Sequence, residues 1–124
     1  MPADRYDRLL QLVHGRAGDS VRLVAAYSAD DWQALYVRDD LKTEALRDAV
    51  PPLIDRLRKY EPIVVPELYD RVGPAEATVE LHEHAAVVHI PEGDCCGVVV
   101  SLDREVARGL SAFVRNCEDV LTDE

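Results

Sequence analysis

Two segments of the chain are apolar on both faces, and they constrain the fold more than any other feature. Residues 20–27 are apolar after the first position except at Arg22, and residues 96–102 are apolar at nearly every position. Because successive side chains of a strand point to opposite faces, a strand of this kind must be covered on both sides. We therefore expect two central strands in one sheet, with helices on both faces.

Shorter runs complete the sheet. Residues 32–37 follow a polar turn and predict a hairpin with residues 20–27. Residues 77–82 and 85–91, joined by Glu83 and His84, predict a second hairpin. If both apolar segments are central, the strands lie in the order 2-1-5-4-3, where the numbers follow the order of the strands in the sequence.

The register of the second hairpin sorts its side chains onto two faces. A two-residue turn places Val79 opposite Val88 and Leu81 opposite Ala86 on an apolar face. The other face then holds residues of mixed polarity, which are Thr78, Glu80, His82, Ala85, Val87 and His89. We expect Glu80, His82 and His89 to be exposed there together.

Three helices are predicted around this sheet. The first covers residues 4–14 and ends at the glycines that follow, and the second covers residues 39–60 with a break at Pro51-Pro52. The third begins at Asp103, a good N-cap, and carries one apolar stripe. Its members are Val106, Leu110, Phe113, Val114, Cys117, Val120 and Leu121. We expect that stripe, Cys117 included, to pack in the core.

This order of elements resembles the roadblock/dynein-light-chain (profilin-like) fold. The resemblance covers residues 1–124 as a single α+β domain and implies a five-stranded antiparallel sheet, with one helix on one face and the two terminal helices on the other. It also implies a homodimer joined through strand 77–82 and the middle helix. A small GTPase is the partner that the fold analogy suggests.

Three short blocks resemble a family of small haloarchaeal proteins. They are residues 35–40 (Leu-Tyr-Val-Arg-Asp-Asp), 87–91 (Val-Val-His-Ile-Pro) and 97–103 (Gly-Val-Val-Val-Ser-Leu-Asp). This second resemblance implies a halophilic host and brings no activity with it.

The charge balance agrees with a halophilic host. The 24 acidic residues outnumber the 14 Lys and Arg, the net charge is -10, and Lys42 and Lys59 are the only lysines. At about 1 M salt, the interaction between two charges is screened beyond roughly 3 Å. Carboxylates on the surface keep the protein hydrated and soluble under these conditions. A GC-rich genome that replaces Lys by Arg is the alternative explanation.

Several classes of function are disfavoured by the same composition. No run of basic residues offers the footprint that a nucleic-acid binder needs, and no apolar run approaches the roughly 18 residues of a membrane span. Three cysteines and a polar N-terminus favour a reduced cytoplasm.

Metal-ligand residue types gather in residues 80–96. The weak metal candidates are Glu80, His82, His89, Cys95 and Cys96. The usual Cys-x-x-Cys and His-Glu-x-x-His spacings are absent, and adjacent cysteines of a strand point to opposite faces. We therefore predict no metal and no cofactor, with surface histidines as the simpler interpretation.

The remaining catalytic patterns are also weak. Cys95-Cys96 suggests a redox pair, although two small strand residues explain it as well. Ser101, Asp103 and the histidines lack the turn that exposes a nucleophilic serine. We therefore predict a protein that is not an enzyme.

Aromatic residues on an edge strand suggest contacts with another protein. Trp32 and Tyr36 belong to residues 32–37, which we expect at one edge of the sheet, and Thr78, Glu80 and His82 lie at the other edge. The favoured hypothesis is a homodimeric protein–protein interaction or regulatory module. The alternative is a metal- or redox-sensing protein that uses His82, His89 and Cys95/Cys96.

Overall fold

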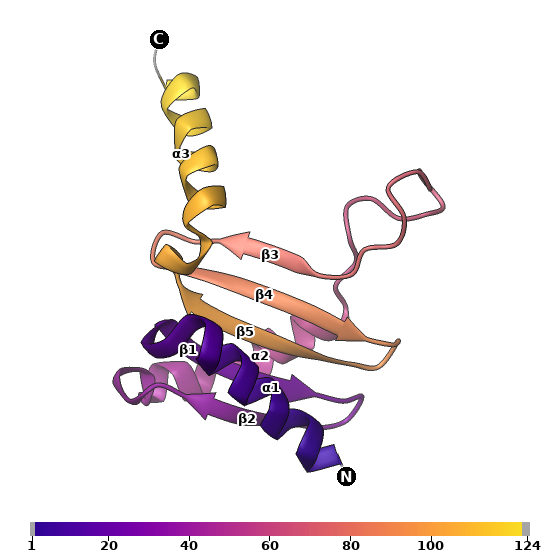
Figure 1. Ribbon diagram of the computed structural model, residues 1–124. Helices are drawn as coiled ribbons and strands as arrows, with labels where there is room; N and C mark the ends of the chain where they lie inside the picture. Colours follow the sequence, from indigo (N-terminus) through magenta and orange to yellow (C-terminus); the bar gives the residue numbers. More distant parts are fainter. Residues whose placement is uncertain (1, 123–124) are drawn as a thin grey trace.

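The protein is an α+β domain built on one five-stranded sheet (Figure 1). The computed structural model describes the backbone of residues 2–122 and the side chains of residues 5–122. In chain order the main elements are α1 (Pro2–Ala17), β1 (Val21–Tyr27), β2 (Trp32–Val37), α2 (Glu44–Arg58), β3 (Thr78–Leu81), β4 (Ala85–Glu92), β5 (Cys96–Asp103) and α3 (Arg108–Thr122). Three short 3-10 helices join them, which are η1 (Gly18–Ser20), η2 (Asp39–Leu41) and η3 (Arg104–Ala107).

The sheet has the predicted order and register. Its strands run β2-β1-β5-β4-β3, and every neighbouring pair is antiparallel. In the β3–β4 hairpin, Val79 pairs with Val88 and Leu81 pairs with Ala86, as the alternation of side chains predicts. The two doubly apolar segments are central because only there can both of their faces be covered.

Each face of the sheet carries one helix (Figure 1). On one face Leu9, Leu10 and Val13 of α1 pack against a buried cluster of strand residues, which are Val21, Val24, Ala26, Val98 and Val100. On the other face Val50 and Ile54 of α2 pack against Tyr27. The core therefore consists of two separate layers divided by the sheet.

Two predicted helix boundaries are wrong. The first helix continues through Gly15 and ends before Gly18, whose φ of 56° is a conformation that glycine adopts without a Cβ clash. The second helix is continuous through Pro51 and Pro52. The carbonyl groups that they leave without an intrahelical partner belong to Arg47 and Asp48, and both of these residues are exposed. Thr43 caps this helix by accepting a hydrogen bond from the Leu46 amide.

The third helix departs most from the prediction. None of the residues of α3 is buried, and in Figure 1 the helix (yellow) extends beyond β3 instead of lying on the sheet. Phe113 is 65% exposed, and Cys117, predicted to be core, is also exposed. A chain needs about 2–6 residues to reverse between a strand and a helix. Here the whole connection between β5 and α3 is the four-residue 3-10 helix η3, which runs on into α3 instead of reversing direction.

Candidate functional site

The residues expected to share an exposed face of the β3–β4 hairpin are divided between two environments. His82 and Glu80 are exposed, and His82 Nε2 lies 2.9 Å from Glu80 Oε1. His89 is only 6% exposed. The prediction of a surface histidine at position 89 is wrong because α2 and the segment after it cover that part of the sheet.

His89 belongs to a small buried polar cluster with Tyr27. Its Nε2 lies 2.7 Å from Tyr27 Oη, and the ring of Tyr60 packs edge-on against it with centroids 5.8 Å apart. Burial lowers the pKa of His89, and burial likewise raises the pKa of Tyr27. Both side chains are therefore neutral near pH 7 and join two strands under α2.

Gly97 makes room for this cluster. It pairs with Tyr27 across β1 and β5, and a Cβ at this position would lie 2.6 Å from Tyr27 Oη and 2.9 Å from the carbonyl oxygen of Ile90. A larger residue would push the Tyr27 ring off His89. Glycine at position 97 is therefore part of the same arrangement.

Cys95 and Cys96 are bonded to each other as a disulfide in the turn between β4 and β5. They line a cavity of about 180 Å³ together with Tyr27, Tyr60 and His89. The adjacent cysteines thus form a redox-capable group beside the buried imidazole. A wider groove of about 780 Å³ continues along α2 past Thr78, Glu80 and His82.

The five metal candidates do not form a ligand set. Within residues 2–122, no group of three or more His, Cys, Asp or Glu residues is placed to hold a metal ion. His89 Nε2 is engaged by Tyr27, and His89 Nδ1 is buried without a hydrogen-bond partner among the described residues. Cys95 and Cys96 hold each other, which leaves only the exposed Glu80–His82 pair.

The interaction candidates on β2 also differ from each other. Trp32 is at the exposed start of this edge strand, 36% accessible, beside a cavity of about 260 Å³ that Tyr6 and Tyr27 also line. Tyr36 packs against the α1 layer and meets the ring of His14 edge-on, with centroids 4.5 Å apart. Trp32 is thus accessible at the surface, whereas Tyr36 packs within the fold.

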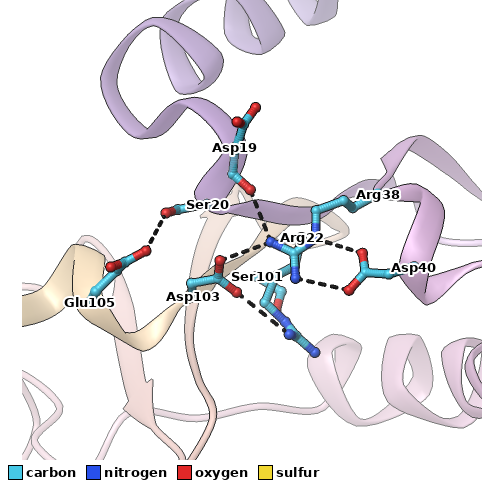
Figure 2. A network of polar contacts seen from close by, with 8 residues as sticks. All are labelled: Asp19, Ser20, Arg22, Arg38, Asp40, Ser101, Asp103 and Glu105. Carbon is cyan, nitrogen blue, oxygen red and sulfur yellow. Dashed lines mark hydrogen bonds and ion pairs between the residues drawn. The ribbon is translucent and has the colours of Figure 1, made fainter.

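A polar network holds the end of β5, where the chain leaves the sheet toward α3 (Figure 2). Arg38 donates to both carboxylate oxygens of Asp40, at 2.6 and 3.1 Å, to Asp103 at 2.8 Å and to the Asp19 carbonyl at 2.9 Å. Arg22 adds a longer ion pair to Asp103, at 3.7 Å. The hydrogen bonds from Arg38 lower the pKa of Asp40. Asp103 is therefore committed to two arginines and does not cap the following helix with its side chain.

Further contacts fix the direction in which α3 begins. Arg104 donates to Ser111 Oγ at 2.7 Å and to the His82 carbonyl at 3.1 Å, and Ser20 donates to Glu105 at 3.0 Å (Figure 2 shows the Ser20 contact). These bonds tie η3 to the β3–β4 turn and to the start of β1. The outward course of α3 therefore follows from contacts on both sides of its first turn.

Two apolar surfaces without a cover result from this arrangement. One is the stripe of α3, which is Leu110, Phe113, Val114, Cys117, Val120 and Leu121 and is continued into η3 by Val106. The other is a groove of about 400 Å³ between α1 and the sheet, which we call the α1–β4 groove. It is lined by Leu9, Leu12, Ile90 and Val98, with Arg5, Arg8 and Glu92 around it. Val79, 47% exposed, extends the same apolar face toward the β3 edge.

The two polar clusters that the sequence analysis missed are the Tyr27–His89 pair and the Arg38 network. Tyr27 lies at the end of a central strand, where its hydroxyl needs a partner, and this was a usable signal. Arg38 lies 65 positions from Asp103, and pattern reasoning does not connect residues at that distance.

Comparison with known proteins identifies a family but assigns no activity to it. No curated protein matches the chain. No helix of the described residues is long and apolar enough to cross a membrane. Residues 7–122 match the family described as Domain of unknown function (DUF7522), which identifies no catalytic class. Because this match spans nearly the whole sequence, the chain belongs to that family.

Proposed function

We propose that the protein is a non-catalytic protein–protein interaction module that forms a homodimer. The carrying observation is the exposed stripe of α3, where Leu110 is 48% and Phe113 65% exposed on the helix with the most regular apolar pattern of the chain. Soluble proteins rarely leave such a contiguous patch open, and patches of this kind mark association sites.

The length of α3 gives a second reason for pairing. Isolated helices shorter than about 12–15 residues are marginal in water, and α3 has 15 residues with none buried. Packing of its apolar side is therefore what would stabilise it. A small GTPase, the partner that the roadblock resemblance implies, is not needed for this pairing.

The acidic surface fits an interface of this type. With a net charge of -10, two copies repel each other at low salt, and screening removes much of that repulsion at about 1 M salt. Apolar contacts persist when charge is screened. We therefore propose that the dimer forms most completely in the salt-rich cytoplasm that the composition predicts.

Light scattering on purified protein at about 1 M salt tests this function. The unmodified chain is expected at twice the 13.8 kDa of one copy. The double variant Leu110→Ser/Phe113→Ser removes two members of the stripe and is expected to be monomeric. Ala112→Ser, on the opposite side of the same exposed helix, is the matched control and should remain dimeric. A monomeric unmodified chain would rule the proposal out.

The redox alternative keeps one supporting observation, which is the Cys95–Cys96 disulfide beside Tyr27 and His89. A dithiol reductant would supply two electrons and two protons, break the S–S bond and leave two thiols in the turn. NMR of His89 and Tyr27 before and after reduction tests whether the cavity responds. The variant Cys95→Ser/Cys96→Ser should reproduce the reduced spectrum, and unchanged His89 and Tyr27 signals would remove this alternative.

A further inference from the structure

Helix α3 and the α1–β4 groove are complementary in apolar character and in length. The helix is about 22 Å long at 1.5 Å per residue over its 15 residues. The groove meets β4 at Ile90 and Glu92, and the apolar face of the sheet continues from there through Val88 and Val79. Strand β4 has 8 residues and a length of about 26 Å, so a helix of this length spans the groove together with the apolar face beside it.

Charge around the groove favours the same fit. Arg5 and Arg8 stand beside it, near the end of β4 at which Arg5 pairs with Glu92. A helix that started near the end of β5 and ran back along the sheet would bring its C-terminal half to this end. Glu118 flanks the apolar stripe in that half of α3, so its carboxylate would face the two arginines.

The chain cannot fill its own groove without losing the contacts that direct α3 outward. Folding back would require reversal within η3, which follows β5 without a connecting residue. It would also break the bonds from Arg104 to Ser111 and to the His82 carbonyl. Short connections that cannot close on their own chain favour exchange of the element between two copies.

We infer that α3 of each copy occupies the α1–β4 groove of a second copy, so that the homodimer exchanges its C-terminal helices. This inference rests on the proposed homodimer and names its interface. Exchange is reciprocal, because a two-fold axis places each helix in the other groove and leaves neither apolar surface open. Phe113, Cys117 and Leu121 would then face Leu9, Leu12 and Ile90 of the other copy.

The exposed Cys117 of α3 allows a direct test by disulfide trapping. Ile90 lies in the groove and is 37% exposed, so Ile90→Cys places a thiol there without opening the core. The variant also carries Cys95→Ser and Cys96→Ser, so that only two thiols can react. Ala45→Cys, exposed on α2 at the other face of the sheet, replaces Ile90→Cys in the matched control.

Oxidation followed by non-reducing electrophoresis and peptide mass spectrometry reads the result. Exchange predicts a covalent dimer in which Cys117 of one copy is bonded to the thiol introduced by Ile90→Cys in the other copy. Its yield should be at least about tenfold above that of the Ala45→Cys control.

Two outcomes would overturn the exchange. One is a bond between Cys117 and the introduced thiol within a single chain, because α3 would then fill its own groove. The other is a dimer in light scattering that forms no bond between Cys117 and the introduced thiol. This second outcome would leave the proposed homodimer intact, so failure of the exchange is distinguishable from failure of the dimer.

Discussion

Helices α2 and α3 carry similar apolar stripes, yet only one of them is packed. In α2, Ile54 is 0% exposed against Tyr27 even though the helix contains two prolines. In α3, which has no proline, none of the residues is buried. Residues 38–43 between β2 and α2 let the chain turn back over the sheet, whereas β5 continues through the 3-10 helix η3 directly into α3. The difference shows that the connection, and not the stripe, decides whether a helix covers its own sheet.

The largest expected effect distinguishes these two helices by stability. Ile54→Ala should lower the free energy of unfolding by about 2–5 kcal/mol, because it leaves a cavity in the packed layer between α2 and the sheet. Leu110→Ala should change the unfolding of the dilute single chain by about 0.5 kcal/mol or less. Urea titrations of both variants at low protein concentration measure the contrast. Equal losses would mean that α3 packs in the core of its own chain.

Substitution of alanine for glycine should change the stability in opposite directions in the two regions. Gly97→Ala should destabilise the fold by about 1–3 kcal/mol, because the new Cβ would meet Tyr27 Oη. Gly109→Ala should stabilise α3 by about 0.5–1 kcal/mol, since no heavy atom lies within 4 Å of the added Cβ and alanine favours the helix. Thermal unfolding of both variants checks the signs. A neutral Gly97→Ala would contradict the tight packing under α2.

The stability of the packed layer between α2 and the sheet should also depend on pH. Burial lowers the pKa of His89, so the unfolded chain binds its proton more tightly than the folded one. The contribution of His89 to stability is therefore complete above the unfolded pKa near 6.5 and is lost as the pH falls below it, by at most about 1.4 kcal/mol per pH unit.

Urea titrations between pH 7 and pH 5 measure this dependence. His89→Phe should flatten the slope relative to the unmodified chain. Val87→Ala, which removes no titratable group from the same face of β4, is the control and should leave the slope unchanged. An unaltered slope in His89→Phe would mean that the imidazole is charged or accessible in the folded state.

The smallest expected effect lies at the β3 edge, outside the closed layer. Glu80→Gln removes the negative charge beside His82, but both side chains are more than half exposed. Exposed pairs contribute about 0–1 kcal/mol, so the midpoint of urea unfolding should hardly move. A large loss of stability would show that the closed region extends beyond His89 to this edge.

The sheet was predictable because its signals are local. Residues 20–27 and 96–102 are apolar on both faces, and this alone places β1 and β5 at the centre. The register of the β3–β4 hairpin follows from the alternation around a short turn. These features depend on neighbouring residues, which pattern reasoning treats well.

The candidate site was less predictable because its contacts are distant in sequence. Tyr27 and His89 lie 62 positions apart, and Arg38 lies 65 positions from Asp103. The position of Cys117 depends on the direction in which η3 starts α3. The apolar pattern of the helix does not predict that direction. The sequence therefore predicts which surface of α3 is apolar but not what covers it.

Amide hydrogen exchange of α3 across a range of protein concentrations tests the central claim most directly. A helix whose apolar face is covered only by a second copy frays in the single chain, so protection of the Leu110 to Leu121 amides should rise with protein concentration. The amides of α2, closed within each copy, should keep the same protection throughout. Equal protection of α3 at every concentration would contradict the account.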